Sequence, residues 1–337
     1  MIKTIFFICS KSFLKNELFN LKSSHNRDNC LYPYYLLKQY LSIKGISLNT
    51  YDYFNKNINE PYSLIFFDFP KNIDYYLKNY PNSDKFLFIY ESPIKNPANQ
   101  IIENHKYFKK IFTWNSIIVD NKKYFKLNYA MQIPTNTPCV NFKNKKLCTA
   151  IFGHKLQSHK LELYSERINA IKWFQNNHLE DFDLYGEGWN KYYFKNKLFH
   201  LNRFQFLTKL LKPNFPFYKG PVKSKIETYK NYKFALCFEN AKFPNYVTEK
   251  IFDCFFARCV PIYLGAPNIT TFIPQNTFID KRQFKTYDEL YNFLTNINEE
   301  TYNKYLENIK NFIKSDKIIP FSAEYFASTI MNEIIKK

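Results

Sequence analysis

The sequence predicts an α/β protein with two domains, and three observations lead to this prediction. Short apolar runs typical of buried parallel strands alternate with segments of helical spacing. This alternation occurs twice, once on each side of a polar, proline-containing stretch at residues 131–147. The chain of 337 residues is also long enough to bury two hydrophobic cores. We therefore expect domains at residues 1–135 and 146–337, with helices at the C-terminal end.

In the N-terminal half, three apolar runs are predicted to be buried strands of a parallel sheet. They are Ile5–Cys9, Leu64–Phe69 and Phe86–Tyr90. Residues Asn29–Ile43 have apolar side chains at helical spacing and end before Gly45, a suitable C-cap. The second and third strands each end at a carboxylate, Asp68 and Glu91.

The C-terminal half repeats this pattern and ends in helices. Its predicted strands are Leu147–Phe152, Phe182–Tyr185, Phe234–Phe238 and Val260–Leu264. A helix is predicted over Leu161–Asn176, and a second one begins at Thr248. A capping box begins at Thr286, and residues 300–313 and 322–336 have amphipathic helical spacing. We expect the last of these helices to pack back on the N-terminal domain.

The formal net charge of +19 suits three kinds of partner: nucleic acid, an anionic membrane surface or an acidic small molecule. Residues 195–233 are notably basic, with Glu227 as their single acid, although a solvated surface would look the same. Seven cysteines without a CxxC pair fit reduced thiols better than a disulfide framework. The histidines show no zinc-ligand spacing, so we expect no structural metal.

No segment approaches the roughly 20 apolar residues that a membrane-spanning helix needs. The N-terminus has a short apolar stretch without a small-residue cleavage site. We therefore expect no signal peptide and a cytoplasmic protein that is at most peripheral to a membrane. The patterns GxGxxG and GxxxxGKS/T are absent, which counts against a dinucleotide-dependent oxidoreductase and a P-loop enzyme.

The segment at residues 231–267 is the most informative part of the chain. It predicts a strand, a loop, a helix and a second strand, with Glu239 and Asn240 at the end of the first strand. Ligands of open α/β sheets bind at this edge, and a helix N-terminus with a lysine suits an anion. Lys250 is a candidate for stabilising a pyrophosphate, and Glu249 for accepting hydrogen bonds from ribose hydroxyls. The alternative is that both are surface charges at an ordinary helix start.

Other candidates for chemistry also follow predicted strands. Glu91 precedes a Ser-Pro pair on a rigid turn, which suits a general base, although a carboxylate that caps loop amides would fit too. Asp68 is a weaker candidate for the same role. Arg167 either holds a phosphate with its planar guanidinium or faces solvent. Gly186 either serves a simple turn or lets the backbone approach a sugar or phosphate.

Three runs of residues occur in a distinctive order. They are YKFALCFEN at 232–240, NYVTEKIFDCFF at 245–256 and VPIYLGAPNI at 260–269. Together they resemble the signature of family 10 glycosyltransferases, the α-1,3/1,4-fucosyltransferases. Weaker likenesses are the Glu-Ser-Pro element that starts at Glu91 and the LYGEGW turn around Gly186.

The resemblance implies a GT-B architecture, in which two Rossmann-like domains face each other across a cleft. The C-terminal domain would bind GDP-fucose, and the N-terminal domain would bind an oligosaccharide or a lipid-linked glycan as acceptor. Transfer would invert the anomeric centre and turn β-linked GDP-fucose into an α-fucoside. The implied donor ligands are Arg167 and Lys250 for the diphosphate, Glu249 for the ribose, and Asn240 and Tyr246 for the fucose or its phosphate.

The resemblance also implies that Glu91 deprotonates the acceptor hydroxyl. It implies that no metal or cofactor is required, because cationic side chains and helix dipoles stabilise the leaving diphosphate. The family's Ser-Asn turn before the arginine helix is replaced here by residues 152–155, where Lys155 is a substitute candidate. Gly186 is a further candidate at the donor site. A lipid-linked acceptor would bring the basic surface to anionic membrane lipid, which we state as a hypothesis.

Two other functions stay open. The same fold could transfer a different nucleotide-activated sugar, because diphosphate ligands do not identify the sugar. The positive charge also suits a basic nucleic-acid-binding protein, but the chain has no recognisable nucleic-acid motif, so we expect no nucleic-acid partner.

Overall fold

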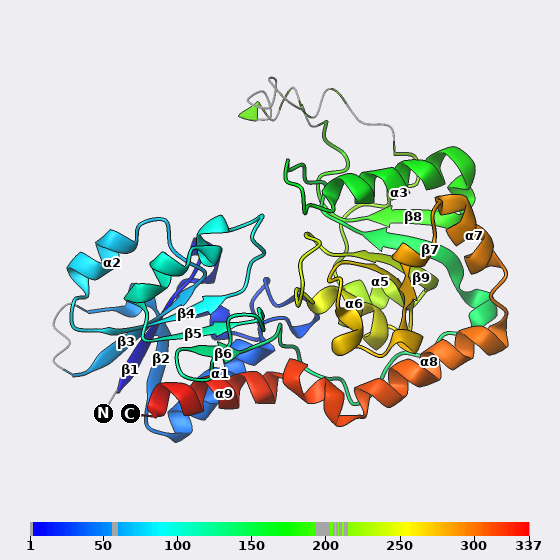
Figure 1. Ribbon diagram of the computed structural model, residues 1–337. Coiled ribbons are helices and arrows are strands. Elements are labelled where there is room, and N and C mark those ends of the chain that lie inside the picture. Colours follow the sequence, from blue (N-terminus) through cyan, green and yellow to red (C-terminus); the bar gives the residue numbers. More distant parts are fainter. Residues whose placement is uncertain are drawn as a thin grey trace. The chain divides into compact units, whose positions relative to one another are not determined.

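The computed structural model describes residues 3–55, 60–192, 194, 203, 204, 206, 208, 211 and 215–336. These residues form two compact units, each built on its own parallel sheet (Figure 1). The N-terminal unit consists of Met1–Ile133, Pro244–Glu249 and Ser315–Lys337, and the C-terminal unit of Pro134–Phe243 and Lys250–Lys314. The predicted basic stretch begins at residue 195, and most of its first half lies outside the described residues.

The N-terminal unit contains a six-stranded sheet with the order β2-β1-β3-β4-β5-β6, in which all neighbouring strands are parallel. Its strands are β1 (Thr4–Ile8), β2 (Ser47–Thr50), β3 (Tyr62–Phe67), β4 (Asp84–Ile89), β5 (Lys110–Thr113) and β6 (Tyr124–Lys126). The helices of this unit are α1 (Tyr32–Ile43), α2 (Ile73–Asn79) and α9 (Ala323–Ile335). Because β3, β4 and β5 are neighbours, the residues that follow them meet at one edge of the sheet.

Both faces of this sheet are covered, which explains why its strands are continuous apolar runs. Successive side chains of a strand point to opposite faces. Phe7 of β1 belongs to the same buried cluster as Leu37 of α1 and Phe326 of α9, whereas the preceding Phe6 belongs to the cluster that contains Tyr76 of α2 on the other face.

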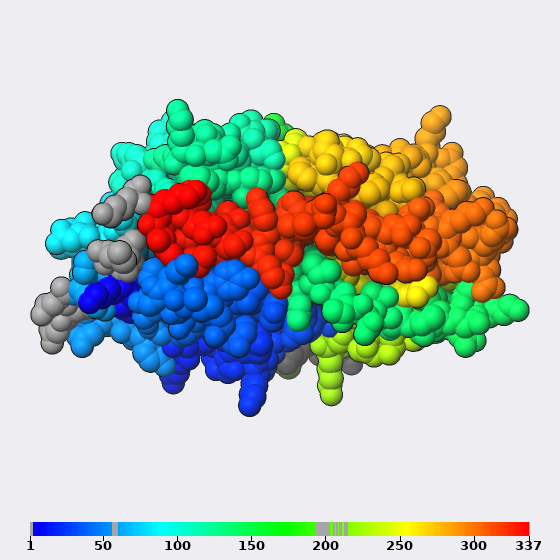
Figure 2. Space-filling model, turned by 90° about the horizontal axis from the view of Figure 1, so that it is seen from below, coloured from blue at the N-terminus to red at the C-terminus, as the bar shows by residue number. Residues whose placement is uncertain are grey.

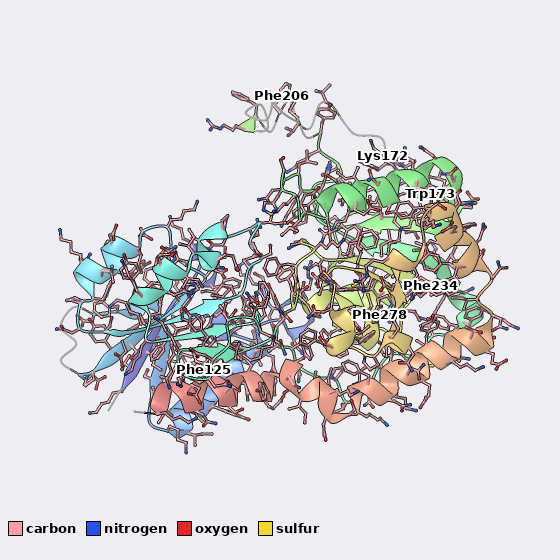
Figure 3. All side chains as sticks on the ribbon, in the orientation of Figure 1. Phe125, Lys172, Trp173, Phe206, Phe234 and Phe278 are labelled. Carbon is pink, nitrogen blue, oxygen red and sulfur yellow. The ribbon has the colours of Figure 1, made fainter. Side chains whose placement is uncertain are left out.

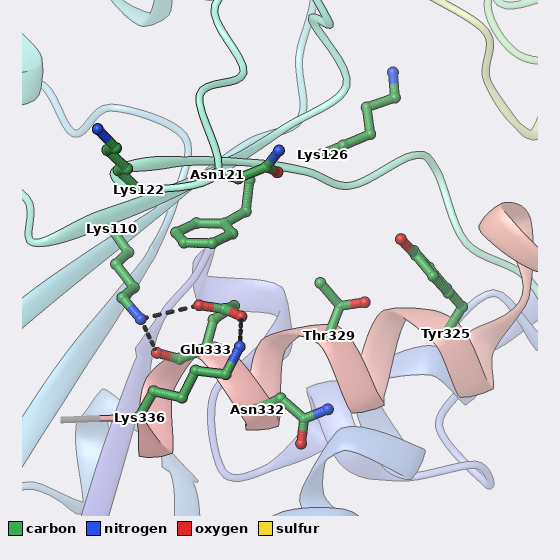
Figure 4. A pocket seen from close by; sticks show the side chains of 10 residues that line it. Lys110, Asn121, Lys122, Lys126, Tyr325, Thr329, Asn332, Glu333 and Lys336 are labelled. Atoms are coloured by element: carbon green, nitrogen blue, oxygen red, sulfur yellow. Dashed lines mark hydrogen bonds and ion pairs between the residues drawn. The ribbon is translucent and has the colours of Figure 1, made fainter.

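Helix α9 lies beside α1 on one face of the N-terminal sheet, as the red and blue surfaces of Figure 2 show. Its end is fixed by ion pairs. Lys110 Nζ donates to the main-chain oxygen of Glu333 at 2.6 Å and to its Oε2 at 3.0 Å, and Lys336 Nζ donates to its Oε1 at 2.5 Å (Figure 4). These bonds close one end of a pocket of about 660 Å³ between α9 and the β5–β6 edge.

The C-terminal unit contains a five-stranded parallel sheet with the order β11-β10-β9-β7-β8. Its strands are β7 (Lys146–Ile151), β8 (Phe182–Tyr185), β9 (Tyr232–Phe238), β10 (Val260–Leu264) and β11 (Ile279–Asp280). Its helices are α3 (Tyr164–Asn177), α5 (Lys225–Tyr229), α6 (Glu249–Phe256, of which Glu249 belongs to the N-terminal unit), α7 (Tyr287–Thr295) and α8 (Glu299–Ile313). Phe234 and Phe278 lie inside this unit, and each is at most 1% exposed (Figure 3).

Two predicted helix boundaries are confirmed by their caps. Gly45 has φ +70° just after α1, and its amide donates to the carbonyl of Ser42 at 2.9 Å, as expected of a C-cap glycine. Thr286 caps α7, because its side-chain oxygen accepts a hydrogen bond from the amide of Glu289 at 3.1 Å.

Two predicted helix starts are wrong. The helix expected from Asn29 begins at Tyr32, after a separate 3-10 turn at Arg27–Asn29. The helix expected from Leu161 begins only at Tyr164. The residues before it pair with the segment after β9 instead, since the amide of Leu163 donates to Asn240 O at 3.1 Å and the amide of Lys242 donates to Leu161 O at 2.7 Å. Long-range pairing therefore overrides the local helical spacing, and it ties the start of α3 to the end of β9.

The structure describes all seven cysteines, and none of them forms a disulfide. Among the residues that the structure describes, no helix combines the length and the apolar character needed to cross a membrane.

Candidate functional site

The C-terminal sheet has a topological switch point between β7 and β9. Strand β8 lies on one side of β7, and the chain then returns to the other side with β9. Ligands of open α/β sheets bind outside the carboxyl ends of the strands at such a point. Residues 152–155 follow β7, and Glu239 and Asn240 follow β9, so these residues mark the expected ligand edge.

An ion pair joins the end of β9 to the first turn of α6. Glu239 is fully buried, and its Oε2 accepts a hydrogen bond from Lys250 Nζ at 2.9 Å. The Lys250 side chain is 20% exposed, so the ammonium is held by the protein and still reaches solvent. A buried carboxylate is tolerated when a cation compensates it. The sequence marks Glu239 only as the polar end of a strand, and its pairing with Lys250 becomes visible in the fold.

Gly265, the residue after β10, makes room for this ion pair. A Cβ at its position would lie 2.4 Å from Tyr263 Oη and 2.6 Å from Glu239 Cγ. The Tyr263 hydroxyl accepts a hydrogen bond from the amide of Ala266 at 3.0 Å. Burial raises the pKa of Tyr263 well above its usual value, and the negative charge of Glu239 adds to the rise. The surroundings of Glu239 are therefore closely packed and fix its carboxylate.

Arg167 lies on the buried face of α3 and is 4% exposed, so the solvent-facing alternative is wrong. Its Nη2 donates to Phe238 O at 2.5 Å and to Asn240 Oδ1 at 3.0 Å. Its guanidinium carbon lies 4.6 Å from the centre of the Phe152 ring, a cation–π distance. Arg167 thus joins α3 to the end of β9 and orients Asn240, while its contact with a phosphate stays a prediction.

Gly186 permits a close crossing of the loops that follow β7 and β8. It has φ +120°, and a Cβ there would lie 2.0 Å from Phe152 O. Trp189 Nε1 donates to the same oxygen at 2.6 Å, and the His154 ring stacks on Trp189 with centroids 4.3 Å apart. The close approach is therefore to the protein's own chain, and a contact with the donor stays a prediction. Lys155 is exposed at this edge of the sheet.

In the N-terminal unit, Glu91 lies in the turn that follows β4. The Asp68 side chain accepts hydrogen bonds from the main chain of this turn. Asp68 Oδ1 accepts hydrogen bonds from the amides of Tyr90 at 2.7 Å and Glu91 at 3.0 Å, and from Asn99 Nδ2 at 2.7 Å. Asp68 is 8% exposed and has φ +63°. Burial raises its pKa, and these hydrogen bonds oppose the rise.

Aromatic side chains donate hydrogen bonds to the carbonyl oxygen of Tyr90 in the same turn. Tyr90 O accepts hydrogen bonds from Trp114 Nε1 at 3.1 Å and from the Tyr129 hydroxyl at 2.5 Å. Tyr246 is 1% exposed, packs edge-on to Trp114 and has its hydroxyl 3.5 Å from that of Tyr129. The structure therefore places Tyr246 in aromatic packing, and its contact with the donor stays a prediction. Burial raises the pKa of Tyr90 to about 12, and the Glu249 carboxylate adds to the rise.

The predicted site residues fall into two groups. Those at the carboxyl edge of the C-terminal sheet are Lys155, Arg167, Gly186, Asn240 and Lys250, and those in the N-terminal unit are Glu91, Tyr246 and Glu249. In the described part of the chain, no three His, Cys, Asp or Glu residues are grouped to hold a metal ion. The first group combines cations with a sheet edge and suits an anionic ligand, and the second provides a carboxylate on a fixed turn.

Two parallel α/β units of this kind are typical of a GT-B fold, and a solved structure confirms the predicted fold class. The crystal structure of an α1,3-fucosyltransferase with GDP-fucose has the same fold, with a TM-score of 0.55 and 17% identity over all of this chain and 91% of that one. A family model described as glycosyltransferase family 10 (fucosyltransferase), C-terminal part, matches residues 142–324. The chain therefore belongs to glycosyltransferase family 10, which confirms the resemblance seen in the sequence.

Individual relatives match over shorter segments. An α-(1,3)-fucosyltransferase from Helicobacter pylori is 39% identical over 90 residues, which are 27% of this chain and 17% of that protein. An α-(1,4)-fucosyltransferase from Arabidopsis thaliana is 37% identical over 70 residues, which are 21% of this chain and 18% of that protein. The matched segments thus span less than a fifth of the length of these two relatives.

Proposed function

We propose that this protein is an inverting, metal-independent fucosyltransferase that moves L-fucose from GDP-β-L-fucose to a hydroxyl group of a glycan. The observation that carries the proposal is the family match at residues 142–324, which contains both the Lys250–Glu239 and the Arg167–Asn240 pairs. These pairs meet at the end of β9, where the topology of the sheet predicts a ligand.

The donor half of the proposal assigns the leaving diphosphate to cationic groups. Lys250 lies in the first turn of α6, where the partial positive charge of the helix N-terminus adds to that of the ammonium. Arg167 contributes a second cation near the end of β9. Such fixed charges stabilise the negative charge that develops on GDP as it leaves, which is the role a metal plays in other transferases. Glu249 binds the ribose, and Asn240 binds the fucose or its phosphate.

The acceptor half of the proposal assigns proton removal to Glu91. The acceptor oxygen forms a bond to the anomeric carbon as the bond from that carbon to the phosphate oxygen breaks. The electron pair of the broken bond leaves with GDP, and the hydroxyl proton passes to the Glu91 carboxylate. A single displacement of this kind converts the β-linked donor into an α-fucoside. The fixed turn at Glu91 supports this role, because a general base must be held within reach of its proton.

We also propose that the acceptor is an oligosaccharide or a lipid-linked glycan and that the protein acts in the cytoplasm, in part at the membrane surface. The net charge of +19 supports contact with anionic lipid, and cysteines that form no disulfide fit a reducing compartment. Cosedimentation with vesicles that contain phosphatidylserine should fall as salt rises. Binding that is independent of both salt and anionic lipid would count against this part.

Calorimetry with GDP, GDP-fucose, GDP-mannose and UDP-sugars tests the donor. We expect GDP and GDP-fucose to bind and UDP-sugars to bind at least tenfold more weakly. A preference for another nucleotide sugar would support the same fold with a different donor. Binding of nucleic acid in place of nucleotides would support the nucleic-acid alternative, which family membership makes the weaker of the two.

Transfer assays with a panel of glycans then test the chemistry. Turnover should persist in EDTA, and loss of turnover that Mg²⁺ or Mn²⁺ restores would contradict metal independence. Glu91→Gln should lower the transfer rate about 10²- to 10⁴-fold, to a small residual rate, and leave GDP affinity unchanged. Transfer at the wild-type rate by Glu91→Gln would assign the base to another residue.

A further inference from the structure

The peptide group that joins Tyr90 to Glu91 has both of its polar atoms bonded to side chains. Its carbonyl oxygen, on Tyr90, accepts hydrogen bonds from Trp114 Nε1 and the Tyr129 hydroxyl. Its N–H, on Glu91, donates to Asp68 Oδ1 at 3.0 Å. Turn peptides are ordinarily bonded to water or to nearby backbone, so side-chain partners on both sides fix this peptide far more strongly than a turn requires.

Asp68 is held as firmly as the peptide that it binds. Asn99 is 1% exposed, and it donates from Nδ2 to Asp68 Oδ1 at 2.7 Å while its Oδ1 accepts from the amide of Phe69 at 2.8 Å. The amide of Asp68 donates to Phe88 O on the neighbouring strand at 2.8 Å. With φ +63°, Asp68 adopts a conformation that few residues other than Gly, Asn and Asp tolerate.

The cost of this arrangement indicates a purpose beyond folding. A carboxylate that is 8% exposed loses hydration, and nothing in the fold of a turn demands that loss. What the carboxylate provides is a set of charge-assisted hydrogen bonds, which are shorter and stronger than those of a neutral acceptor. Two of them go to the consecutive amides of Tyr90 and Glu91.

We propose that Asp68 is a positioning residue for Glu91: it fixes the main chain at residues 90–91 so that the Glu91 carboxylate is aimed at the acceptor hydroxyl. This inference rests on the proposed function, in which Glu91 is the general base. A displacement of about 1 Å at a reacting group can lower a rate about 100-fold. Asp68 is poorly placed to be the base itself, because its Oδ1 already accepts hydrogen bonds from three protein groups.

Asp68→Asn is the informative variant, because asparagine tolerates the backbone conformation, keeps an oxygen acceptor and removes only the charge. We expect kcat to fall 10- to 100-fold and GDP affinity to stay within twofold of the wild type. Asp120→Asn is the matched control. The Oδ1 of Asp120 likewise accepts from consecutive amides, at Lys122, Lys123 and Tyr124, but this loop precedes β6 and lies apart from Glu91.

A double-mutant cycle separates positioning from a general loss of stability. In the Glu91→Gln background, Asp68→Asn should lower the residual rate less than twofold, because there is no base left to position. The amides of Tyr90 and Glu91 should also exchange with solvent at least tenfold faster in Asp68→Asn. If Asp68→Asn fails to fold, Asn99→Ala removes the donor that holds Asp68, and the same loss of kcat is expected.

The outcomes of this experiment are distinct. Wild-type kcat in Asp68→Asn, a kcat loss equal to that of Asp120→Asn, or independent effects of Asp68→Asn and Glu91→Gln would each overturn the positioning role alone. Full activity of Glu91→Gln would overturn the proposed base and the positioning role with it.

Discussion

Replacing Lys250 by alanine should have two separable effects, one on stability and one on nucleotide binding. The Lys250 ammonium lies 2.9 Å from a carboxylate oxygen of Glu239, which is fully buried. At this distance two unit charges attract by about 6 kcal/mol if the effective dielectric constant is about 20. Partial exposure of Lys250 screens part of this attraction, so we expect Lys250→Ala to lower the free energy of unfolding by roughly 3 kcal/mol.

The effect on GDP should come from a different interaction. A charge-assisted hydrogen bond to phosphate contributes about 1.5–3 kcal/mol, which corresponds to a loss of about 10- to 150-fold in GDP affinity. Lys225→Ala is the matched control, because Lys225 Nζ pairs with Asp253 of the same helix α6 at 2.6 Å, and both side chains are largely buried. Lys225→Ala should destabilise the protein to a similar extent and leave the GDP dissociation constant unchanged.

The double variant Lys250→Ala/Glu239→Gln separates the two effects completely. Without its charge, Glu239 no longer needs a cation, so the double variant should regain roughly 2 kcal/mol of the lost stability. Its GDP affinity should stay as low as that of Lys250→Ala. Urea denaturation measures the first quantity and calorimetry with GDP the second. If GDP affinity returned together with stability, Lys250 would act through folding, and its assignment to the diphosphate would be refuted.

Three further predictions concern the scaffold. Gly186→Ala should lower the free energy of unfolding, measured by urea denaturation, by more than about 2 kcal/mol, because the new Cβ would lie 2.0 Å from Phe152 O. A smaller loss would mean that the loops after β7 and β8 move apart easily. Glu333→Gln should lower the free energy of unfolding by about 1–3 kcal/mol, because its partner Lys110 is largely buried beside it. An unchanged urea midpoint would show that apolar packing alone holds α9 in place. Burial lowers the pKa of Lys126 from 10.5 to about 8. Below pH 8 the folded protein bears the cost of the buried ammonium, and between pH 8 and 10.5 the unfolded chain binds more protons. The stability of the wild type relative to Lys126→Met should therefore rise by roughly 3 kcal/mol over this range, and a flat difference would contradict burial of the ammonium.

The sequence predicts the C-terminal sheet well, because its central strands are apolar and separated by clear turn residues. Phe182–Tyr185 and Val260–Leu264 have the predicted bounds. Strand β8 is short too, but the glycine turn at residues 186–188 marks its end, whereas β2 (Ser47–Thr50) and β6 (Tyr124–Lys126) have neither an apolar run nor a glycine turn after them. The start of α3 is mispredicted for another reason, since pairing with the segment after β9 involves residues far apart in the chain.

The candidate site shows the same difference between residues that local sequence identifies and partners that come from distant segments. Lys250 and Asn240 lie within one strand–loop–helix segment, so local order suffices to nominate them. The partners that decide what these residues can do come from elsewhere, because Arg167 reaches Asn240 from α3. Sequence spacing does not reveal whether the Arg167 side chain is buried. Its exposure of 4% shows that Arg167 is held inside the fold and is not a surface charge.

Glu91 shows why a short motif cannot specify a catalytic geometry. A Glu-Ser-Pro element says only that a carboxylate follows a strand and precedes a rigid residue. Its main chain is fixed by Asp68 and Trp114, which follow the strands on either side of β4 in the sheet. The parallel order β3-β4-β5 thus brings together three residues that the sequence keeps apart, and β5 is not among the strands that the sequence predicts. If this geometry serves catalysis, variants of Asp68 should lower kcat and leave nucleotide affinity unchanged, because Asp68 acts on the position of Glu91. Variants of Trp114 should lower kcat too, and they should weaken nucleotide binding as well if Tyr246, which packs edge-on to Trp114, contacts the donor.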